Sequence, residues 1–559
     1  MDILLYILFF SLILLTVIGT GQNDERPLVS TKYGQLWGVI VPVKETTRIV
    51  DAFFGIPFAK PPVGSLRFAN PEPPEPWRSV REASEYPPMC LQVEDFMNGL
   101  GKYYQTSLKM PKPSEDCLYL NVFTPTDRDK KSELPVMVYI HGGGLVLGLA
   151  SIYDGSALSA YENVVVVVIQ YRLGIPGFFS IRDDQSRGNY GFFDQVAALQ
   201  WVQENIADFG GDPTSVTIFG ESAGAVSVST LVLSPLSKGL FHRAIAESGT
   251  IIMPKLAVSK SEDFKFYINF VSKVSGCELA SITDCLKKKS EEELLAIAKV
   301  MGMLLLPASV DGFLLPKPPE KMLANKESNK VPFLIGMNNH EFGWFAPALF
   351  NITGITEGMT RESVVLNLQK LPSLGLSPEV IPFAVDNYLG DTTDPIEIRN
   401  RFLDLCGDVM FVIPILKMAK SHRDMGLPIF LYEYQHPPSR MAPVRPDFVK
   451  ADHADELNYV FGGPFLRNGV LFAGNATHEE KVLARTVMRY WANFAGTGDP
   501  NSPGLTPWPQ YGADEHYLEI NLQQKSSSKL KEEKFRFWTE VLPQKLQSQK
   551  EDGSDRIEL

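Results

Sequence analysis

The residue best placed to do chemistry in this chain is Ser222. It is the middle residue of Gly220-Glu221-Ser222-Ala223-Gly224, which follows the apolar run 215–219 and precedes a segment rich in Ala and Val. A nucleophilic serine on a tight turn from a strand into a helix needs neighbours without bulk, because the backbones around the turn pass close together. We therefore predict a nucleophile elbow, in which Glu221 tunes the local charge, rather than an ordinary glycine turn.

A second glycine-rich segment lies upstream of this elbow. The apolar run 134–140 ends in His141-Gly142-Gly143-Gly144. Residues without side chains let backbone N–H groups converge on one point, which suits the oxyanion that forms during acyl transfer. We expect the amides of Gly143, Gly144 and Ala223 to form the oxyanion hole. A flexible loop is the alternative, and the strand-like run before the glycines disfavours it.

An acid and a histidine should follow the serine in that chain order. The apolar run 331–336 leads to Glu341, and the strand-like run 429–434 leads through a Pro-rich stretch to His453. Catalytic groups in open α/β sheets lie at the carboxyl ends of the strands. Glu341 is therefore the predicted acid and His453 the predicted base. His340 is predicted to have no direct role, because its neighbour is needed as the acid.

Together these groups predict covalent catalysis. His453 takes the proton of Ser222 as the hydroxyl attacks an ester carbonyl, and Glu341 holds the imidazole in the required tautomer. The alcohol then leaves with the proton from the histidine, and water hydrolyses the acyl-enzyme by the same steps.

Beyond these motifs, the sequence resembles the type B carboxylesterase family of α/β-hydrolases over nearly its whole length, from about Pro27 to Trp538. The stretches that carry the resemblance are Ser114-Glu115-Asp116-Cys117-Leu118-Tyr119-Leu120-Asn121-Val122, His141 to Gly144, Phe219 to Gly224 and Ala246-Glu247-Ser248-Gly249. The segment Glu341-Phe342-Gly343-Trp344 looks most like vertebrate endoplasmic-reticulum carboxylesterases. Asn338-Asn339 resembles the carboxylesterase 2, cocaine esterase-like branch more than the carboxylesterase 1 branch.

The resemblance implies an α/β-hydrolase fold, with a large and mostly parallel central sheet flanked by helices. Because the predicted triad extends from Ser222 to His453, the catalytic unit cannot be divided between them, and we predict one domain over residues 22–545 with a tail at 546–559. Roughly 255–323 and 356–424 are expected to be helical insertions that cap the site.

The amino-acid composition limits the kinds of partner that the chain is expected to bind. The 559 residues include 53 Lys and Arg against 65 Asp and Glu, a net charge of −12, which disfavours nucleic acid as a partner. No Gly-rich phosphate loop and no clustered metal-ligand spacing was found, so the sequence implies no cofactor and no metal site. The implied partners are small-molecule ester substrates.

Four kinds of function remain to be compared. The resemblance implies a broad carboxylesterase acting on xenobiotic and lipid esters, with amides or thioesters as further substrates. A cholinesterase-like enzyme is less expected, because choline-binding members carry a tryptophan between the first two cysteines and 91–116 has none. A lipase would need a lipid-facing lid, which is not identified. Non-catalytic binding proteins on this scaffold lose triad members, whereas all three are present here.

The N-terminus predicts entry into the secretory pathway. Residues 3–18 are almost all apolar and Gly19-Thr20-Gly21 follows, which fits a signal peptide over 1–21. A membrane anchor is the rival, but the run is shorter than the ~20 apolar residues that span a bilayer, and no membrane span is expected in the mature chain. The ending Arg556-Ile557-Glu558-Leu559 resembles the Lys-Asp-Glu-Leu class, so a retention receptor and the endoplasmic-reticulum lumen are expected, with secretion as the alternative.

The five cysteines should then pair, as they do in oxidising compartments. Nearness in the chain suggests Cys277 with Cys285, and the family pattern suggests Cys90 with Cys117. Cys406 is left over in an apolar setting, which predicts a buried and inert thiol. Two sequons, beginning at Asn351 and Asn475, are predicted glycosylation sites.

Overall fold

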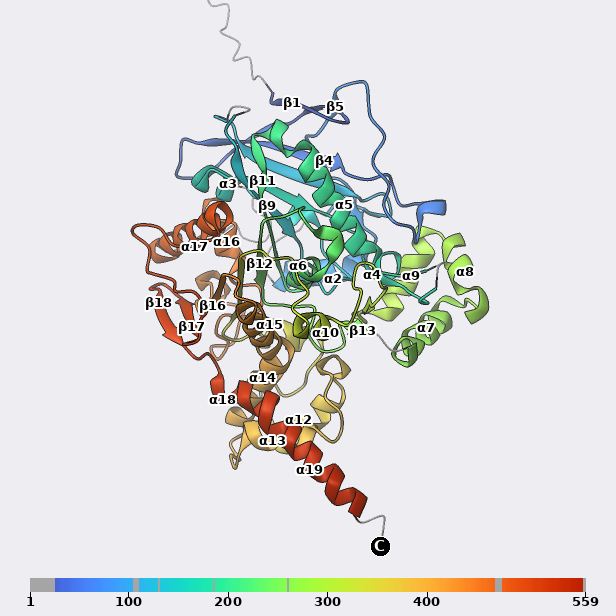
Figure 1. Cartoon of the computed structure of the whole chain (residues 1–559), viewed down its shortest axis with the longest axis vertical. Helices are drawn as coiled ribbons and strands as arrows, with labels where there is room; N and C mark the ends of the chain where they lie inside the picture. The colour runs from blue at the N-terminus through green and yellow to red at the C-terminus, as the bar shows by residue number, and fades with distance from the viewer. Residues whose placement is uncertain are drawn as a thin grey trace, which may run out of the picture.

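The computed structural model describes residues 26–103, 110–128, 131–183, 186–258, 261–467 and 475–555. The predicted signal peptide and the ending 556–559 lie outside these residues. Within them, the centre of the molecule is an eleven-stranded sheet in the order β18-β17-β16-β15-β12-β11-β9-β10-β8-β4-β3 (Figure 1). These strands are β3 (Val39–Pro42), β4 (Ile49–Pro57), β8 (Tyr119–Pro125), β9 (Leu134–Ile140), β10 (Val165–Ile169), β11 (Gly211–Glu221), β12 (Arg243–Glu247), β15 (Phe333–Asn338), β16 (Ile429–Tyr434), β17 (His516–Ile520) and β18 (Lys525–Ser528).

The middle of the sheet is parallel. Strands β10, β9, β11, β12, β15, β16 and β17 pair in parallel, whereas β8, β4 and β3 on one side and β18 on the other pair antiparallel. Parallel strands are covered on both faces and therefore read as continuous apolar runs. All five residues of β10 are buried. The expected α/β class with a mostly parallel sheet is confirmed.

Alternate residues of each strand enter two different cores. On β9, Val136 and Val138 pack into one core, and Met137 and Tyr139 pack into the other, because side chains along a strand alternate between the two faces. The first core is covered by α5 (Tyr190–Asn205) and α6 (Ala223–Leu233), and the second by α3 (Ser156–Glu162) and α17 (His478–Thr497). Figure 1 shows α3 and α17 beside each other.

The two regions expected as insertions are helical. The first contains α7 (Ser261–Ser275), α8 (Ile282–Lys288), α9 (Glu291–Met301) and α10 (Pro319–Ala324). The second contains α12 (Arg361–Gln369), α13 (Ile381–Leu389), α14 (Pro395–Gly407), the π-helical turn η7 (Asp408–Val412) and α15 (Ile413–Asp424). Helix α15 packs against β15 and β16, so the last part of the second region covers the sheet itself.

The chain continues beyond the sheet into a helical C-terminal segment. It consists of α18 (Glu532–Arg536), the π-helical turn η10 (Phe537–Val541) and α19 (Leu542–Asp555). In Figure 1 this segment runs beside α12 and α13 at the end of the molecule away from β1 (Leu28–Thr31). Among the described residues, no helix combines the length and the apolar character that a membrane span requires.

Both expected disulfides are present, Cys90 with Cys117 and Cys277 with Cys285. Cys406 is a buried free thiol on α14, and burial raises its pKa well above the ordinary value. A thiol that stays protonated is a poor nucleophile, so the inert role predicted from the sequence fits its surroundings.

Candidate active site

Ser222 is the single residue between β11 and α6. Its φ of 56° and ψ of −122° form a conformation that residues other than glycine adopt only at an energetic cost. A Cβ on Gly220 would lie 2.6 Å from the carbonyl oxygen of Ile140 on β9, and a Cβ on Gly224 would overlap the same oxygen. The predicted elbow is therefore formed, and its two glycines are required because β9 leaves no space for side chains.

The three residues of the predicted triad meet at the carboxyl edge of the sheet, beyond the ends of β11, β15 and β16. The Oγ of Ser222 lies 2.9 Å from Nε2 of His453, and Nδ1 of His453 lies 2.6 Å from Oε2 of Glu341. A carboxylate only accepts hydrogen bonds, so Nδ1–H donates to Glu341 and Nε2 is left to accept from the serine hydroxyl. Glu341 and His453 are buried, whereas Ser222 keeps some exposure to the cavity.

Asn338, at the end of β15, joins the acid to the loop of the histidine. Its backbone N–H donates to Oε1 of Glu341 at 2.6 Å. Its side-chain amide donates to the carbonyl of Asp452 at 2.7 Å and to Oε2 of Glu456 at 2.6 Å. Sequence reasoning had used Asn338 only as a mark of one family branch, although a polar residue at the end of an apolar strand could have indicated this role.

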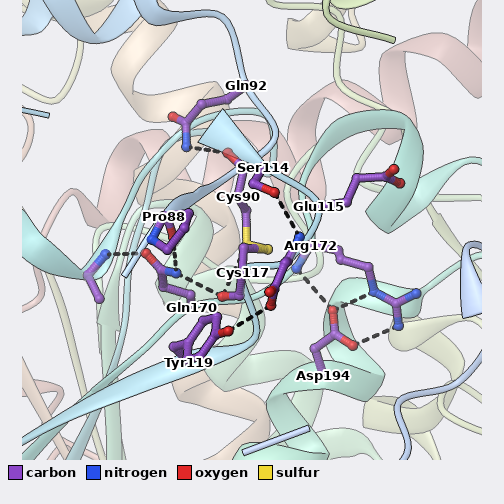
Figure 2. Close-up of a disulfide and its surroundings, with 12 residues drawn as sticks. Pro88, Cys90, Gln92, Ser114, Glu115, Cys117, Tyr119, Gln170, Arg172 and Asp194 are labelled. Carbon is purple, nitrogen blue, oxygen red and sulfur yellow. Dashed lines mark hydrogen bonds and ion pairs between the residues drawn. A yellow bond between two sulfur atoms is a disulfide. The ribbon is translucent and has the colours of Figure 1, made fainter. Parts of the chain in front are cut away.

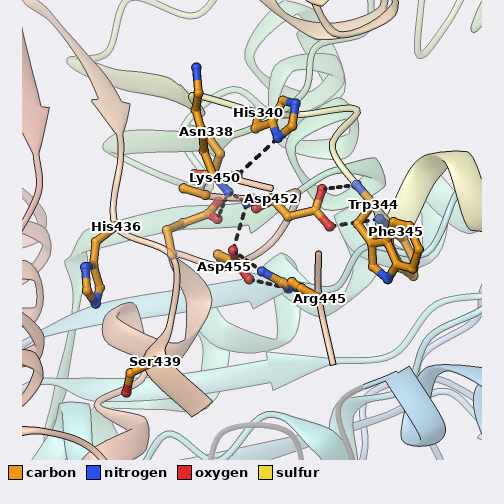
Figure 3. Close-up of polar contacts among 12 residues, drawn as sticks. Asn338, His340, Trp344, Phe345, His436, Ser439, Arg445, Lys450, Asp452 and Asp455 are labelled. Atoms are coloured by element: carbon orange, nitrogen blue, oxygen red, sulfur yellow. Dashed lines mark hydrogen bonds and ion pairs between the residues drawn. The ribbon is translucent and has the colours of Figure 1, made fainter. Parts of the chain in front are cut away.

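The loop that carries His453 is fixed by acidic neighbours on both sides of it (Figure 3). The carboxylate of Asp452 accepts from the backbone N–H of Trp344 at 3.2 Å and of Phe345 at 2.8 Å, just after the predicted acid. Asp455 accepts two hydrogen bonds from Arg445, at 2.6 and 2.7 Å. The segments of the acid and the base are therefore held together by their neighbours as well as by the triad. Sequence reasoning missed both aspartates.

His340 takes part in the same framework, not in the triad. Its Nδ1 accepts a hydrogen bond from the backbone N–H of Lys450 at 3.2 Å, and residues 340 and 452 form a parallel bridge. Burial lowers the pKa of this histidine. These contacts agree with the expectation that it has no direct catalytic role.

A second carboxylate faces the histidine from the other side. Oε1 of Glu221 lies 3.0 Å from Nε2 of His453. Burial raises the pKa of Glu221 to about 7. Burial alone would lower the pKa of His453, but the carboxylates of Glu221 and Glu341 outweigh that effect and raise it. The site is thus arranged to stabilise an imidazolium, the form of the histidine that appears once the serine has lost its proton.

The glycine loop is held in one conformation by hydrogen bonds to its carbonyl groups. Nδ1–H of His141 donates to the carbonyl of Gly142 at 2.9 Å, and the carbonyl of Gly143 accepts from the N–H of Leu147 at 3.0 Å. Each bonded carbonyl fixes the peptide plane whose N–H belongs to the next residue. The amides of Gly143 and Gly144, two of the three predicted oxyanion donors, are therefore pre-oriented.

His141 is itself immobilised. The ring of Tyr171 stacks on it at a centroid distance of 4.5 Å, and the Tyr171 hydroxyl donates to its carbonyl at 2.8 Å. Burial lowers the pKa of His141 to about 4, so the imidazole is neutral at physiological pH.

The disulfide between Cys90 and Cys117 is connected to the glycine loop through Gln92, which Figure 2 shows next to Cys90. The side-chain amide of Gln92 donates to the carbonyl of Cys90 at 3.0 Å and to the carbonyl of Gly148 at 2.8 Å, and its oxygen accepts from the N–H of Gly148 at 2.9 Å. A Cβ on Gly148 would overlap the ring of His141. A continuous set of contacts therefore runs from the disulfide to the predicted oxyanion donors.

The triad opens into a cavity of ≈ 490 Å³. The predicted oxyanion donors and Ser222 line it together, and its wall is largely apolar. Side chains from separate parts of the chain contribute to that wall, among them Met253, Leu256, Met303, Leu305, Met410 and Phe411. Among the described lining residues the carboxylates are Asp95 and Glu221, and neither Lys nor Arg is present.

The two predicted glycosylation sites are not among the residues that line this cavity. Asn351 and Asn475 are both exposed, so each sequon is open to solvent. Among the described residues, no group of three or more His, Cys, Asp and Glu side chains is arranged to hold a metal ion.

Comparison with known families gives this site its context. Residues 25–538 match the model of the carboxylesterase family. The chain belongs to the carboxylesterase family. As a member of that family it is a carboxylic-ester hydrolase, and the serine carboxylesterase activity expected from the sequence is confirmed.

Individual relatives align with this chain over nearly its whole length. A medium-chain fatty acyl-CoA hydrolase precursor of Anas platyrhynchos is 49% identical over 96% of each chain. An acylcarnitine hydrolase of Mus musculus is 47% identical over 99% of this chain and 98% of its own. A cocaine esterase of Homo sapiens is 46% identical over 98% of this chain and 97% of its own.

Proposed function

We propose that this carboxylesterase hydrolyses uncharged, largely apolar carboxylic esters through an acyl-enzyme on Ser222. The observation that carries the proposal is the alignment of Ser222, His453 and Glu341, at 2.9 and 2.6 Å, at the floor of an apolar cavity. Such a constellation activates a serine toward a carbonyl carbon.

In the proposed mechanism, Nε2 of His453 removes the proton of Ser222 as Oγ attacks the ester carbonyl. Glu341 fixes the tautomer and, with Glu221, stabilises the imidazolium that forms. The backbone N–H groups of Gly143, Gly144 and Ala223 donate hydrogen bonds to the developing oxyanion. The imidazolium then protonates the leaving alcohol, and a water molecule repeats the attack on the acyl-enzyme.

The proposed substrate class follows from the cavity wall. An apolar wall without Lys or Arg among the described lining residues favours apolar acyl and alcohol groups over strongly anionic ones. The xenobiotic and lipid esters expected from the family resemblance have this character. The names of the relatives, which include a cocaine esterase and an acylcarnitine hydrolase, support ester hydrolysis, and they add esters with a positively charged group to the panel. Amides and thioesters are the further substrates to be compared.

The central experiment compares the wild-type enzyme with Ser222→Ala on a small chromogenic ester, with time courses early enough to detect a burst. We expect a burst of one equivalent in the wild type and a loss of at least about 10⁴-fold in kcat in the variant. Ser526→Ala, at an exposed position on β18, is the matched control and should keep full activity. Equal inactivity of two folded proteins would contradict the proposal and favour a binding function.

We also propose that residues 22–545 form one catalytic domain, in which parts of the helical regions 255–323 and 356–424 cap the cavity. Met303 and Leu305 of the first region, and Met410 and Phe411 of the second, line the cavity and support this reading. Exchange of either pair for alanine should change the order of preference in an ester panel while the burst amplitude is retained.

For its location we propose the lumen of the endoplasmic reticulum, with secretion as the alternative. Two disulfides, two exposed sequons and the apolar run 3–18 support passage through an oxidising, glycosylating compartment. A retention receptor would bind the ending 556–559. Replacement of Glu558 and Leu559 by alanine should move the protein into the medium. Asn351→Gln and Asn475→Gln should each remove one glycosidase-sensitive step in electrophoretic mobility.

A further inference from the structure

The π-helical turn η7, residues 408–412, interrupts the long helix formed by α14 and α15. Such π-helical insertions are found frequently at functional sites. Here the turn places Met410 and Phe411 on the wall of the active-site cavity. The ring of Phe411 lies 4.7 Å, centroid to centroid, from the ring of His453, with 42° between their planes.

The residue before the turn faces the acid of the triad, with little space between them. A Cβ on Gly407 would lie 3.7 Å from Cβ of Glu341 and 3.6 Å from the backbone nitrogen of Phe342. The turn therefore contacts His453 through Phe411, and the residue before it lies close to Glu341. A shift of this turn would be transmitted to the relative position of Glu341 and His453.

The first residue of the turn, Asp408, is held from the opposite side by groups that have no contact with the cavity. It is 2% exposed. Its Oδ2 accepts a hydrogen bond from the hydroxyl of Tyr388 on α13 at 2.8 Å, and its Oδ1 lies 3.2 Å from Nζ of Lys531, just before α18. A buried carboxylate with these two partners has few alternative positions, because leaving either partner unpaired is costly.

The contacts that hold Asp408 extend to the C-terminal segment. Nε1–H of Trp538 on η10 donates to the hydroxyl of Tyr388 at 3.1 Å, and Nζ of Lys534 on α18 lies 3.9 Å from the centre of the Tyr388 ring. Contacts therefore lead from the C-terminal segment through Tyr388 and Asp408 to the turn that carries Phe411. Asp408, Tyr388, Lys534 and Trp538 do not line the cavity.

We propose that Asp408 is a positioning residue for the hydrolytic reaction, that Tyr388 and Lys531 hold it, and that Trp538 in turn holds Tyr388. The hydrogen-bonded carboxylate of Asp408 fixes the position of the π-turn. The turn in turn keeps Phe411 packed against His453, and this contact keeps the imidazole aligned between Glu341 and Ser222. A misplacement of about 1 Å in a catalytic group can reduce a rate by about 10²-fold. This inference rests on the proposed triad, because it assigns Asp408 an effect on the reactivity of that triad.

The test is a double-mutant cycle on kcat, normalised to active sites by titration with a phosphonate ester. Normalisation excludes molecules that have lost their fold. We expect Asp408→Asn and Phe411→Leu each to lower kcat by about 10- to 100-fold, while KM for a small ester changes less than about twofold for Asp408→Asn. If Asp408 acts through Phe411, the double variant should be only slightly slower than Phe411→Leu alone. Additive losses would overturn the proposal.

Asp404→Asn is the matched control. Asp404 lies one turn earlier on α14, its side chain is half-exposed, and its Oδ1 is 3.8 Å from the same Nζ of Lys531. The control removes the same charge from the same helix and should leave kcat within about twofold of wild type, because surface ion pairs contribute little. An equal loss in Asp404→Asn would show a general charge effect and would also overturn the proposal.

Tyr388→Phe keeps the proposal testable if Asp408→Asn does not fold, because it removes a single hydroxyl. We expect Tyr388→Phe to lower kcat less than Asp408→Asn does, with KM unchanged. When Tyr388→Phe is added to Phe411→Leu, we expect no further loss of kcat. A kcat equal to wild type would contradict the inference. Failure of the proposed function would look different, because Ser222→Ala would then retain the wild-type rate.

Discussion

At the scale of single residues, two carboxylates share one histidine. Glu341 accepts from Nδ1 of His453, and Glu221 lies at the ion-pair distance of 3.0 Å from Nε2, the nitrogen that must also accept the proton of Ser222. The second carboxylate therefore has two opposing effects. It stabilises the imidazolium formed during attack, and it raises the pKa of the histidine, so that less free base is present in the resting enzyme.

Glu221→Gln should separate these effects. Removal of the negative charge lowers the pKa of His453, so the acid limb of the profile of kcat/KM against pH should move to lower pH, because that limb reports the free enzyme. At higher pH the imidazolium loses one stabilising charge, and kcat should fall by about 10-fold. The exposed Glu85→Gln is the control. An acid limb that stays in place would contradict this account of the site.

His141 offers a second test at this scale. His141→Phe keeps an aromatic ring against Tyr171 but removes the Nδ1–H that holds the carbonyl of Gly142. We expect kcat to fall by about 10-fold, less than the 10²–10³-fold loss for a missing oxyanion donor, because the amide of Gly143 remains but is less well oriented. The measurement is kcat per titrated active site. An unchanged value would mean that the glycine loop does not need this hydrogen bond.

Residues with a local signature could be predicted from the sequence, and residues defined by long-range contacts could not. Ser222 stands in a five-residue motif that can be recognised without its distant neighbours, and His453 follows a recognisable strand. Asn338 and Asp452 act across a separation of 114 residues. No pattern within either segment indicates which partner the fold will bring to it.

At the scale of elements, the elbow depends on how closely β9, β11 and α6 approach one another. Gly224→Ala adds a methyl group that would overlap the carbonyl oxygen of Ile140, an atom fixed by the sheet. We expect a loss of about 3 kcal/mol or more in the free energy of unfolding, at the upper end of the range for overpacked cores. Thermal denaturation checks this. Gly512→Ala, which meets nothing within 4 Å, should leave the melting temperature nearly unchanged.

The two disulfides should differ in their effect on catalysis. Replacement of Cys90 and Cys117 by serine opens a loop with a sequence separation of 27 residues, and we expect a loss of about 3–4 kcal/mol in stability. It should also lower kcat, because Gln92 carries the constraint to Gly148 and the glycine loop. Replacement of Cys277 and Cys285, 8 residues apart, should reduce stability less and leave kcat unchanged. Equal kcat values in the two double variants would exclude the link through Gln92.

Helices and strands could be predicted where the apolar residues recur with a clear period. Irregularities within a helix could not, because they depend on packing against distant parts of the chain. The strands that lead to the triad and the helices within 255–323 and 356–424 could be read from the sequence. The π-turn at 408–412 could not, because its apolar residues Val409 to Val412 fit an ordinary buried helix equally well. The turn becomes visible only when Asp408 and Phe411 are seen to face different partners.

At the scale of the whole molecule, buried carboxylates couple stability to pH. Burial raises the pKa of Glu221 to about 7 and of Glu247 to about 8, above the ordinary value of 4.5. The folded state therefore binds more protons than the unfolded state in this range, and stability falls as the pH rises from about 4.5 to 8. Burial alone would raise the pKa of Glu480, but hydrogen bonds from His436 and Ser439 outweigh it and hold the pKa well below its ordinary range. That group favours folding above about pH 4.5, and its contribution is lost in stronger acid.

These opposing dependences predict a maximum of the melting temperature in mild acid, with a decline between about pH 5 and pH 8. The net charge of −12 contributes to the decline through repulsion, so the wild-type curve alone does not isolate the buried groups. Glu247→Gln isolates the contribution of one buried group. The amide can still accept the hydrogen bond from Nε1–H of Trp491, which is 2.9 Å long in the wild type, but it does not titrate. Its melting temperature should fall less steeply over this range than that of wild type, whereas Glu85→Gln should keep the wild-type slope. Parallel curves for wild type and Glu247→Gln would mean that Glu247 does not contribute to the pH dependence of folding.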